Sequence, residues 1–221
     1  MSKKRVGERV AAVTVAQGST KHPVNSIRSV CVYCGSGLGK NPAYTAAART
    51  LGAELAAHRI GLVYGGGSLG LMGEVARSTL DNGGTVTGII PGFLTEKEQM
   101  MRDADELIIT TDMHERKRFM FERSDAFVAL PGGVGTLEEL VEQLTWVQLG
   151  RHTKPVVVAN IDGFWSPFLS LLTHMKADTF IRPGLEVSFT VVDDAQKIVP
   201  AIMAAAMKHE KPVDAAVLAK F

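Results

Sequence analysis

Two short segments of the sequence concentrate the residue types that can do chemistry. The first is PGGVGTLEE, residues 131–139, in which three glycines precede Thr136 and two glutamates. Glycine lets the backbone approach a ligand closely, and a helix that starts here directs its free N–H groups and positive dipole end at the same point. We therefore predict an anion site suited to phosphate, to which the Thr136 hydroxyl adds a donor.

The role of Glu139 is open on these grounds. Thr136 and Glu139 have the spacing of a capping box for a helix over 136–149, which requires no function. A helical projection places an apolar stripe toward the sheet, made of Leu137, Leu140, Val141, Leu144 and Gln148. Glu139 lies roughly opposite, with Gln143 and Trp146, so we expect it to point away from the sheet. Trp146 on that face suggests contact with a partner subunit.

The second segment, DMHERKRFMFERS (112–124), places two cations among apolar residues. A helix over 112–123 has a solvated face, and Arg116 and Lys117 fall on the other, with Met113, Met120 and Phe121. Buried cations without partners are costly. Their charged ends therefore either extend to water or meet anions, from a ligand or from Glu139. His114 is either a proton carrier or, as a lone histidine more often is, a structural residue.

Two other glycine segments depart from the known nucleotide-binding patterns. GGGSLG (65–70) matches G-x-G-x-x-G, but the next strand ends in IIPGF, without the carboxylate that would bind a ribose. It therefore forms either a tight turn or a site for a mononucleotide or phosphate ester. GSGLGKN (35–41) lacks the spacing of a P-loop and has Asn41 where Ser or Thr would bind magnesium, which argues against an NTPase.

Short strands rich in Val and Ile alternate with helices along the chain. Strands running into turns are expected over 28–37, 60–67, 85–92, 106–110, 125–133, 154–160 and 187–194, and helices over 42–58, 69–80, 112–123, 136–149, 164–176 and 195–207. This alternation predicts an α/β fold with a doubly wound parallel sheet in a single domain. Ligands bind such sheets at the carboxyl ends of the strands, so the three glycine clusters are expected to form one site.

Composition limits the class of protein. The chain has 221 residues, 46% of them hydrophobic, and a formal net charge of +1. No basic run predicts nucleic-acid binding, and no apolar run approaches the roughly 18 residues of a membrane helix. Cys31 and Cys34 have no second pair for a zinc site, and their spacing puts them on opposite faces of a strand. We expect two buried thiols in a reducing cytoplasm.

The ends of the chain are expected to lie outside the fold. Residues 1–27 are interpreted as a flexible extension rather than an export signal, because Glu8 and Thr14 interrupt its basic and apolar parts. The folded domain is expected over 28–207, followed by a tail over 208–221.

PGGVGTLEE together with MHERK resembles the LONELY GUY (LOG) family of cytokinin-activating phosphoribohydrolases. The family signature PGG-x-GT-x-x-E is matched from Pro131 to Glu139, and the similarity runs from about Val30 to Leu172. Such sequences are often labelled "possible lysine decarboxylase", but no lysine here lies in a recognisable pyridoxal-phosphate setting. The resemblance implies a Rossmann-like fold and a homodimer or an assembly of dimers. We expect no cofactor, and no metal, because the sequence offers no cluster of metal ligands.

The resemblance also implies an activity and its residues. The activity is hydrolysis of N6-substituted adenosine 5′-monophosphates to the free base and ribose 5-phosphate. Arg116 and Glu139 would be the catalytic pair. The implied substrate-binding residues are Glu98, Arg116, Lys117, Gly133, Val134, Gly135, Thr136, Leu137, Glu138, Glu139 and Thr145, and Gly132 is expected to help bind the phosphate.

Two other functions stay open at this point. One is a salvage hydrolase that acts mainly on AMP, and the other is a nucleotide sensor on the same fold without turnover. The base pocket would separate the first from a cytokinin-activating enzyme. Met100, Met101 and Trp146 are candidates to line it, although core or interface positions suit each of them. A charged pair of Arg116 and Glu139 argues against a pure sensor, which does not need both.

Overall fold

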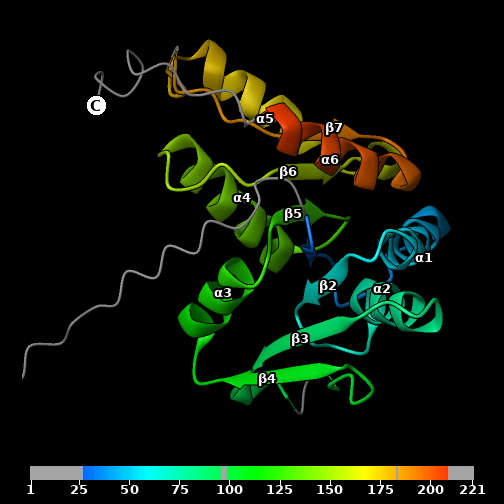
Figure 1. Ribbon diagram of the computed structural model, residues 1–221. Coiled ribbons are helices and arrows are strands. Elements are labelled where there is room, and N and C mark those ends of the chain that lie inside the picture. The colour runs from blue at the N-terminus through cyan, green and yellow to red at the C-terminus, as the bar shows by residue number, and fades with distance from the viewer. Residues whose placement is uncertain (1–26, 96–98, 183, 209–221) are drawn as a thin grey trace, which may run out of the picture.

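The computed structural model describes residues 27–208, except 96–98 and 183. Seven parallel strands form one sheet in the order β4-β3-β2-β1-β5-β6-β7 (Figure 1). The strands are β1 (Ser29–Tyr33), β2 (Gly61–Tyr64), β3 (Val86–Pro91), β4 (Glu106–Thr110), β5 (Ala126–Ala129), β6 (Val156–Ala159) and β7 (Thr190–Val192). The parallel sheet confirms the predicted fold class. Of the expected N-terminal extension and C-terminal tail, only residues 27 and 208 are described.

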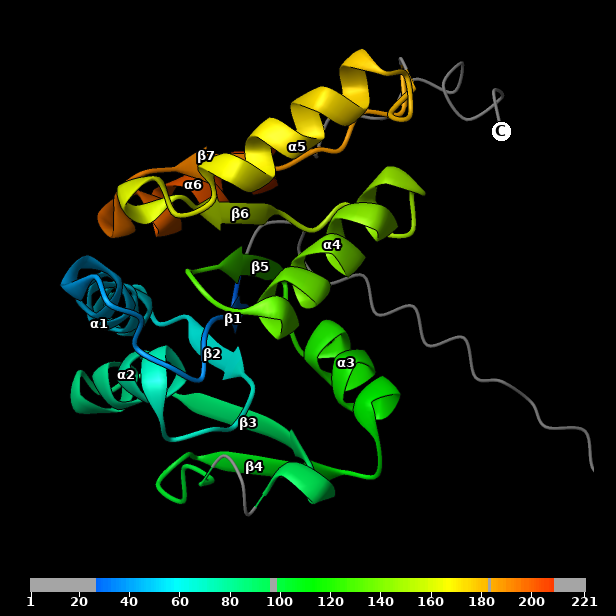
Figure 2. The same cartoon turned by 180° about the vertical axis from the view of Figure 1, so that it is seen from behind.

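Helices cover both faces of the sheet (Figures 1 and 2). One face carries α1 (Pro42–Ala57), α2 (Gly70–Asp81) and α6 (Ile198–Lys208), and the other carries α3 (Met113–Glu122), α4 (Val134–Gln148) and α5 (Ser166–Ala177). Each face has its own apolar core cluster, because the strands are buried on both sides and contribute alternate residues to each.

Strand β1 illustrates how the sequence divides between the two cores. Val30 and Val32 pack in the core under α1 and α2, whereas Cys31 and Tyr33 pack in the core under α3 and α4. Cys34 follows on the α1 side, so the two cysteines lie on opposite faces, both buried and both free. This confirms their prediction as separate buried thiols.

The strand order reverses between β1 and β5, and the glycine segments meet at that point. The amide of Gly35 donates to the carbonyl of Pro131 at 3.1 Å, which joins the loops after β1 and β5. The amide of Met72, in the first turn of α2, donates to the carbonyl of Gly35 at 3.3 Å. Gly35, Gly65 and Gly133 also line one cavity, which confirms the predicted meeting of the three glycine clusters at one edge of the sheet.

Strands β1 and β2 run into glycine turns within the ranges 28–37 and 60–67, as expected. The boundary predicted for the strand over 125–133 was wrong, because β5 ends four residues earlier, at Ala129. The last strand, expected over 187–194, is reduced to β7, Thr190–Val192. Val187 and Phe189 instead pack as loop residues against the core under α3, α4 and α5. Val187 and Phe189 alternate with polar residues as in a strand, but here the alternation arises because one side of a loop packs against the core.

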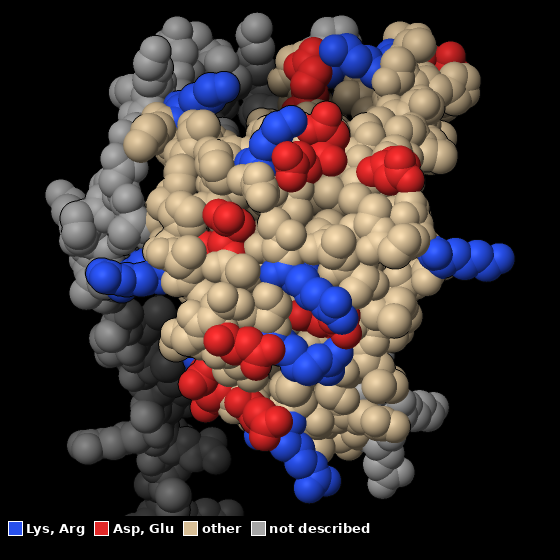
Figure 3. All heavy atoms as spheres, turned by 90° about the vertical axis from the view of Figure 1, so that its right-hand side faces the viewer, with Lys and Arg blue, Asp and Glu red and all other residues tan. Residues whose placement is uncertain are grey.

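The face over α1, α2 and α6 carries acidic and basic side chains that are interspersed (Figure 3). Arg49 of α1, for example, pairs with Glu74 of α2, which also pairs with Arg77 of its own helix. Among the described residues of this face, such mixing leaves no extended basic surface for a row of phosphates. No helix in the described part of the chain is long and apolar enough to cross a membrane.

His152 anchors the loop between α4 and β6 in an aromatic cluster under α3. Its ring centroid lies 5.3 Å from that of Phe121 and 5.6 Å from that of Phe127. Its Nδ1 accepts a hydrogen bond from the backbone N–H of Lys154 at 3.2 Å. Burial, and secondarily the charge of Lys154, lower the pKa of His152 from 6.5 to about 4.

The low pKa of His152 makes stability depend on pH. Between pH 6.5 and 4 the unfolded chain binds a proton that the folded chain does not, so the free energy of unfolding falls as the pH falls through this window. The shift corresponds to about 3 kcal/mol when complete. His152→Asn should reduce this pH slope, measured by urea unfolding at pH 7, 5.5 and 4.5. His58→Gln, at an exposed position, is the control, and an equal slope in His152→Asn and the wild type would contradict the assignment.

Candidate functional site

Helix α3 is fixed at its start by reciprocal capping. The Asp112 carboxylate accepts the backbone N–H of Glu115 at 2.8 Å, and the Glu115 carboxylate accepts the backbone N–H of Thr111 at 2.8 Å. These bonds hold the first turn, so the pKa of Asp112 is lowered, chiefly by the bond from Glu115. Arg116 follows one residue after Glu115. Its position beside the carboxyl end of β3 therefore depends on this cap.

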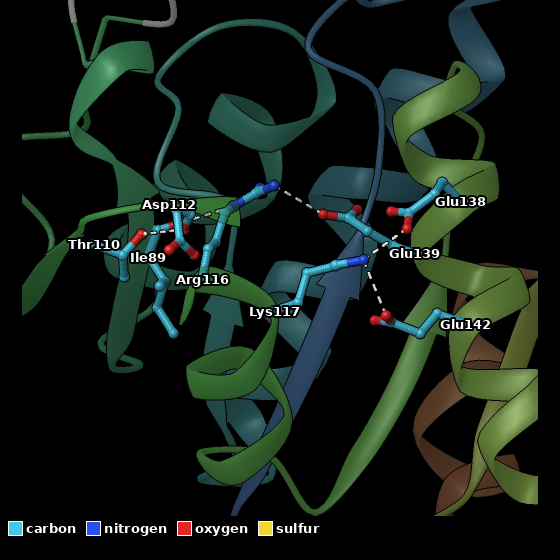
Figure 4. A network of polar contacts seen from close by, with 8 residues as sticks. All are labelled: Ile89, Thr110, Asp112, Arg116, Lys117, Glu138, Glu139 and Glu142. Carbon is cyan, nitrogen blue, oxygen red and sulfur yellow. Dashed lines mark hydrogen bonds and ion pairs between the residues drawn. The ribbon is translucent and has the colours of Figure 1, made fainter. Parts of the chain in front are cut away.

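Arg116 and Glu139 form a buried ion pair between α3 and α4 (Figure 4). The Arg116 Nη1 lies 3.0 Å from the Glu139 Oε1, and each side chain is 10% exposed. The Arg116 Nε donates to the carbonyl of Ile89, the fourth residue of β3, at 3.1 Å. Of the two alternatives for Arg116, contact with an anion is the one observed, and that anion is Glu139.

Helix α4 begins earlier than predicted. Its first residue is Val134, and its N-cap is Gly133, which has no capping side chain. Thr136 is therefore the third residue of the helix and is buried, so it cannot be the cap. The capping-box interpretation of Thr136 and Glu139 was wrong. Gly133 has an extended backbone and no side chain that could cap the helix. The sequence therefore contains no capping residue that would mark the start of α4.

The predicted orientation of α4 was also wrong in part. Glu139 and Gln143 are buried, at 8% and 1% exposure, whereas Val141 of the predicted sheet-facing stripe is 41% exposed. The reason is that α3 packs beside α4 and covers the face on which Trp146 suggested contact with a partner subunit. Trp146 contacts Phe121 of α3 edge-on at 5.1 Å. Trp146 therefore has a partner in its own chain.

A cavity of about 260 Å³ lies in front of the ion pair. Arg116 and Glu139 are the charged residues among those that line it, beside Val32, Tyr33, Cys34, Gly35, Ser36, Gly65, Met72, Met120, Gly133, Val134, Gly135 and Thr136. The amide groups of the first turn of α4 have no partners within the helix, so this cavity combines an anion-binding helix end with a carboxylate and a guanidinium.

Glu139 is the carboxylate that the cavity offers as a base or nucleophile. Cys34 also lines the cavity, but burial, and secondarily the charge of Glu139, raise its pKa far above its usual range. Burial likewise raises the pKa of Tyr33. Both groups therefore stay protonated at neutral pH. Among the described residues, no group of three or more His, Cys, Asp or Glu side chains could hold a metal ion.

A second cavity of about 280 Å³ adjoins the first and shares Gly35, Ser36 and Gly133 with it. Its walls include Tyr44 and Phe164, whose rings meet edge-on at 5.4 Å. The side chains that line it carry no charge, so it differs in chemistry from the cavity of the ion pair.

Lys117 points toward α4 but not into the cavity. Its Nζ lies 2.7 Å from the Glu138 carboxylate and 2.9 Å from the Glu142 carboxylate (Figure 4). Burial alone would lower the pKa of Lys117, but these two hydrogen bonds outweigh it and the pKa is raised. The predicted contact of this cation with anions is confirmed, and a second ion pair runs beside the first between α3 and α4.

The structure brings together only part of the predicted set of binding residues. Thr145 is exposed on α4, and its hydroxyl donates to the carbonyl of Val141 at 2.8 Å. Leu137 and Glu138 belong to α4 but do not line the cavity. Gly132 lies just before the cavity, packed against the side chain of Thr136. Glu98 lies outside the described residues.

The other candidates from the sequence lie away from the cavity. His114 is exposed on α3, and Met101 is buried in the core under α1 and α2. Neither Met100 nor Trp146 lines either of the two cavities. A core position was one of the alternatives for Met101, and it is the one observed.

Gly65 lines the cavity, as expected for the glycine cluster over 65–67. Sequence reasoning missed two other contributions of the strand ends: the carbonyl of Ile89 holds Arg116, and Tyr33 forms part of the cavity wall. A backbone carbonyl has no signal in the sequence, and Tyr33 lies in an apolar strand pattern. The available signal was positional, because each lies at or near the carboxyl end of a strand close to the reversal of strand order.

Comparisons with known proteins agree with these motifs. A model of the family described as "Possible lysine decarboxylase" matches residues 72–202. A probable cytokinin riboside 5′-monophosphate phosphoribohydrolase of Oryza sativa subsp. japonica is 47% identical over 87% of this chain and 84% of its own length. A cytokinin riboside 5′-monophosphate phosphoribohydrolase of Arabidopsis thaliana is 45% identical over 87% of this chain and 82% of its own. The chain belongs to the LONELY GUY family.

Solved structures show the same fold in more distant proteins. A molybdenum cofactor carrier protein from Chlamydomonas reinhardtii has a TM-score of 0.58 and 26% identity, and the match covers 89% of this chain and all of that one. A molybdenum cofactor binding protein from Rippkaea orientalis has a TM-score of 0.61 and 21% identity, over 81% of this chain and 97% of that one. At such identity the second match shows the fold alone.

The buried ion pair predicts a stability effect. Arg116→Met removes the guanidinium that faces a buried carboxylate, which should destabilise the protein by about 3 kcal/mol in urea unfolding. Glu139→Gln in the same background should recover part of that loss, because it removes the buried charge. The control is Arg118→Met, whose side chain is 60% exposed and should cost less than about 1 kcal/mol. Equal losses in the two arginine variants would contradict the account.

Proposed function

We propose that the protein hydrolyses the N-glycosidic bond of N6-substituted adenosine 5′-monophosphates, releasing the free base and ribose 5-phosphate. The observation that carries this proposal is the Arg116–Glu139 pair, which lies in a cavity at the start of α4. The curated relatives are named for this reaction, with cytokinin nucleotides as substrates. Their similarity extends over most of both chains, so the proposal concerns the whole domain.

The start of α4 is the proposed phosphate site. Gly133, Gly135 and Thr136 all line the cavity, and no heavy atom lies within 4 Å of the positions that a Cβ would take at the two glycines. Their backbone is therefore open to a ligand. The free N–H groups and the positive end of the helix dipole favour a dianionic phosphate at this point.

Gly132 supports this site from behind. A Cβ at Gly132 would collide with the side chain of Thr136. The glycine therefore lets the loop pack directly on the first turn of α4, which fixes the Thr136 side chain in place. We propose that the Thr136 hydroxyl adds a hydrogen bond to the phosphate.

The chemistry follows from the position of Glu139. Cleavage of an N-glycosidic bond builds positive charge on the ribose, as in other glycoside hydrolyses. A carboxylate beside the sugar stabilises that charge and can orient or deprotonate the attacking water. Glu139 follows the phosphate-binding turn by one helical turn, so a phosphate held at Gly133 and Gly135 places the ribose next to its carboxylate. Phosphate binding then contributes to lowering the barrier at the reacting bond.

Arg116 has a supporting role in this mechanism. A guanidinium does not give up its proton, so Arg116 is a poor general acid. Its charge stabilises the ionised form of Glu139, and the bond to Ile89 fixes its direction. The leaving base gains electron density as the bond breaks, and a fixed positive charge can stabilise that density without proton transfer.

The remaining family positions stay predictions. Lys117, Val134, Leu137, Glu138 and Thr145 lie on α3 or α4 around the ion pair, and of these Val134 lines the cavity. Lys117 already forms ion pairs with Glu138 and Glu142, which link α3 to α4. A contact between Lys117 and the substrate would have to form in addition to these pairs or replace one of them. No cofactor enters the proposed reaction.

The reaction and its carboxylate can be tested together. Purified protein is given AMP and isopentenyladenosine 5′-monophosphate separately, and free base is measured by chromatography. We expect faster release from the prenylated nucleotide. Glu139→Gln should lower the turnover number by about a hundredfold or more, because the sugar charge loses its carboxylate. Inhibition by ribose 5-phosphate, which reports the phosphate site, should change little.

The control is Glu122→Gln, at an exposed position near the end of α3, which should retain wild-type turnover. Comparable turnover by Glu139→Gln would refute the catalytic assignment. Release from AMP alone would identify a nucleotide salvage hydrolase. Inhibitor binding without any release would identify a nucleotide sensor.

We also propose a homodimer or an assembly of dimers in the cytoplasm. Helix α5 has no buried residue, and Leu171 and Met175 on it are 47% and 37% exposed. An apolar surface of this kind suits contact with a second copy. The free, buried state of Cys31 and Cys34 suits a reducing compartment.

Sedimentation tests the assembly. We expect a mass of at least about twice the 23.7 kDa of the chain. Leu171→Glu should shift the protein toward monomer, because it places a charge in the apolar contact. Ser170→Glu, at the preceding exposed position, is the matched control. A wild-type protein that sediments as a monomer would contradict the proposal.

A further inference from the structure

We propose that Gly65 is a positioning residue for the reaction: the space left by its missing side chain holds the guanidinium of Arg116 in place against Glu139. Gly65 directly follows β2 and lines the cavity of the ion pair. The catalytic consequence of this inference rests on the proposed function, whereas its structural part does not.

The available space sets the constraint. A Cβ on Gly65 would lie 2.5 Å from the Nη2 of Arg116 and 3.7 Å from its Cζ. The same Cβ would lie 2.9 Å from the Sδ of Met72. Real Cβ atoms do not approach other heavy atoms as closely as 2.5 Å, so any side chain at this position displaces the guanidinium.

Arg116 has little freedom to move aside. Its Nε donates to the carbonyl of Ile89 at 3.1 Å, and its Nη1 contacts the Glu139 carboxylate at 3.0 Å. Gly65 bounds the guanidinium on the side of Nη2. A displacement caused by the Gly65→Ala substitution would therefore lengthen the contact with Glu139, the contact with Ile89, or both.

Backbone conformation does not explain the glycine. Gly66 and Gly70 have φ of 79° and 59°, where other residues are strained, but Gly65 is not among the glycines with positive φ. Alanine can adopt the backbone of Gly65 without strain of that kind. The group it would meet is a side-chain end, so the chain should fold and Arg116 should shift. The need for glycine at this position is thus the need to leave room for Arg116.

The first test compares two matched glycines at strand ends. Gly65→Ala should lower the turnover number by about a hundredfold with KM for the nucleotide nearly unchanged, because it misplaces a group beside the reacting bond. Gly92→Ala, after β3, is the control: its Cβ would meet its nearest neighbours at 3.8 Å and should keep wild-type turnover. Circular dichroism should show both variants folded. Wild-type turnover in Gly65→Ala would overturn the proposal.

The second test asks whether Gly65 acts through Arg116. Lysine lacks the Cζ and Nη atoms, so adding Gly65→Ala to Arg116→Lys should cost little further activity and little further thermal stability. In a Met72→Val background, which removes the sulfur contact, Gly65→Ala should still cost as much as in the wild type. A loss that persists with Arg116→Lys, or disappears with Met72→Val, would overturn the proposal.

The thermal-stability readout separates this inference from the proposed function. If the wild type releases no base from any nucleotide, the proposed function fails, but the coupling between Gly65→Ala and Arg116→Lys in the melting temperature is still measured. Coupling would support the positioning role, and independent effects would refute it.

Discussion

The structure depends on one buried interaction, the ion pair between Arg116 of α3 and Glu139 of α4. Two charges at this depth are costly alone and tolerable together, so the two helices have to meet at this point. Several local features serve that requirement. The reciprocal cap of Asp112 and Glu115 fixes where α3 begins, and the carbonyl of Ile89 ties the guanidinium to the sheet. The bonds of Lys117 to Glu138 and Glu142 run beside the pair.

The same constraint links the fold to its chemistry. The reversal of strand order between β1 and β5 opens a cavity at the carboxyl ends of the strands, and the ion pair forms one wall of it. The first turn of α4 forms another wall of the cavity. The proposed phosphate site and the Glu139 carboxylate therefore lie on the same helix, one turn apart. A ligand anchored by its phosphate meets a carboxylate that is already oriented. Arg116 and Glu139 are thus already oriented before the ligand binds.

Much of this followed from the sequence, and the errors have definite physical causes. Alternating strands and helices predicted the sheet, and the apolar neighbours of Arg116 made contact with an anion one of two alternatives. The face of Glu139 was wrong because a helical projection contains the periodicity of α4 but not the position of α3, which covers that face. The start of α4 was wrong because Gly133 caps through its backbone. The space that Gly65 leaves for Arg116 is a contact between distant segments, which no local pattern encodes.

The most direct test of the central claim follows the oxygen atom of the attacking water. The protein is incubated with isopentenyladenosine 5′-monophosphate in ¹⁸O-labelled water, and the products are analysed early in the reaction by mass spectrometry. We expect free base together with ribose 5-phosphate that carries the label on its sugar carbon C1, and far less of both products with Glu139→Gln. Label in released inorganic phosphate, with the base still attached to the sugar, would contradict it, because the protein would then cleave the phosphate ester.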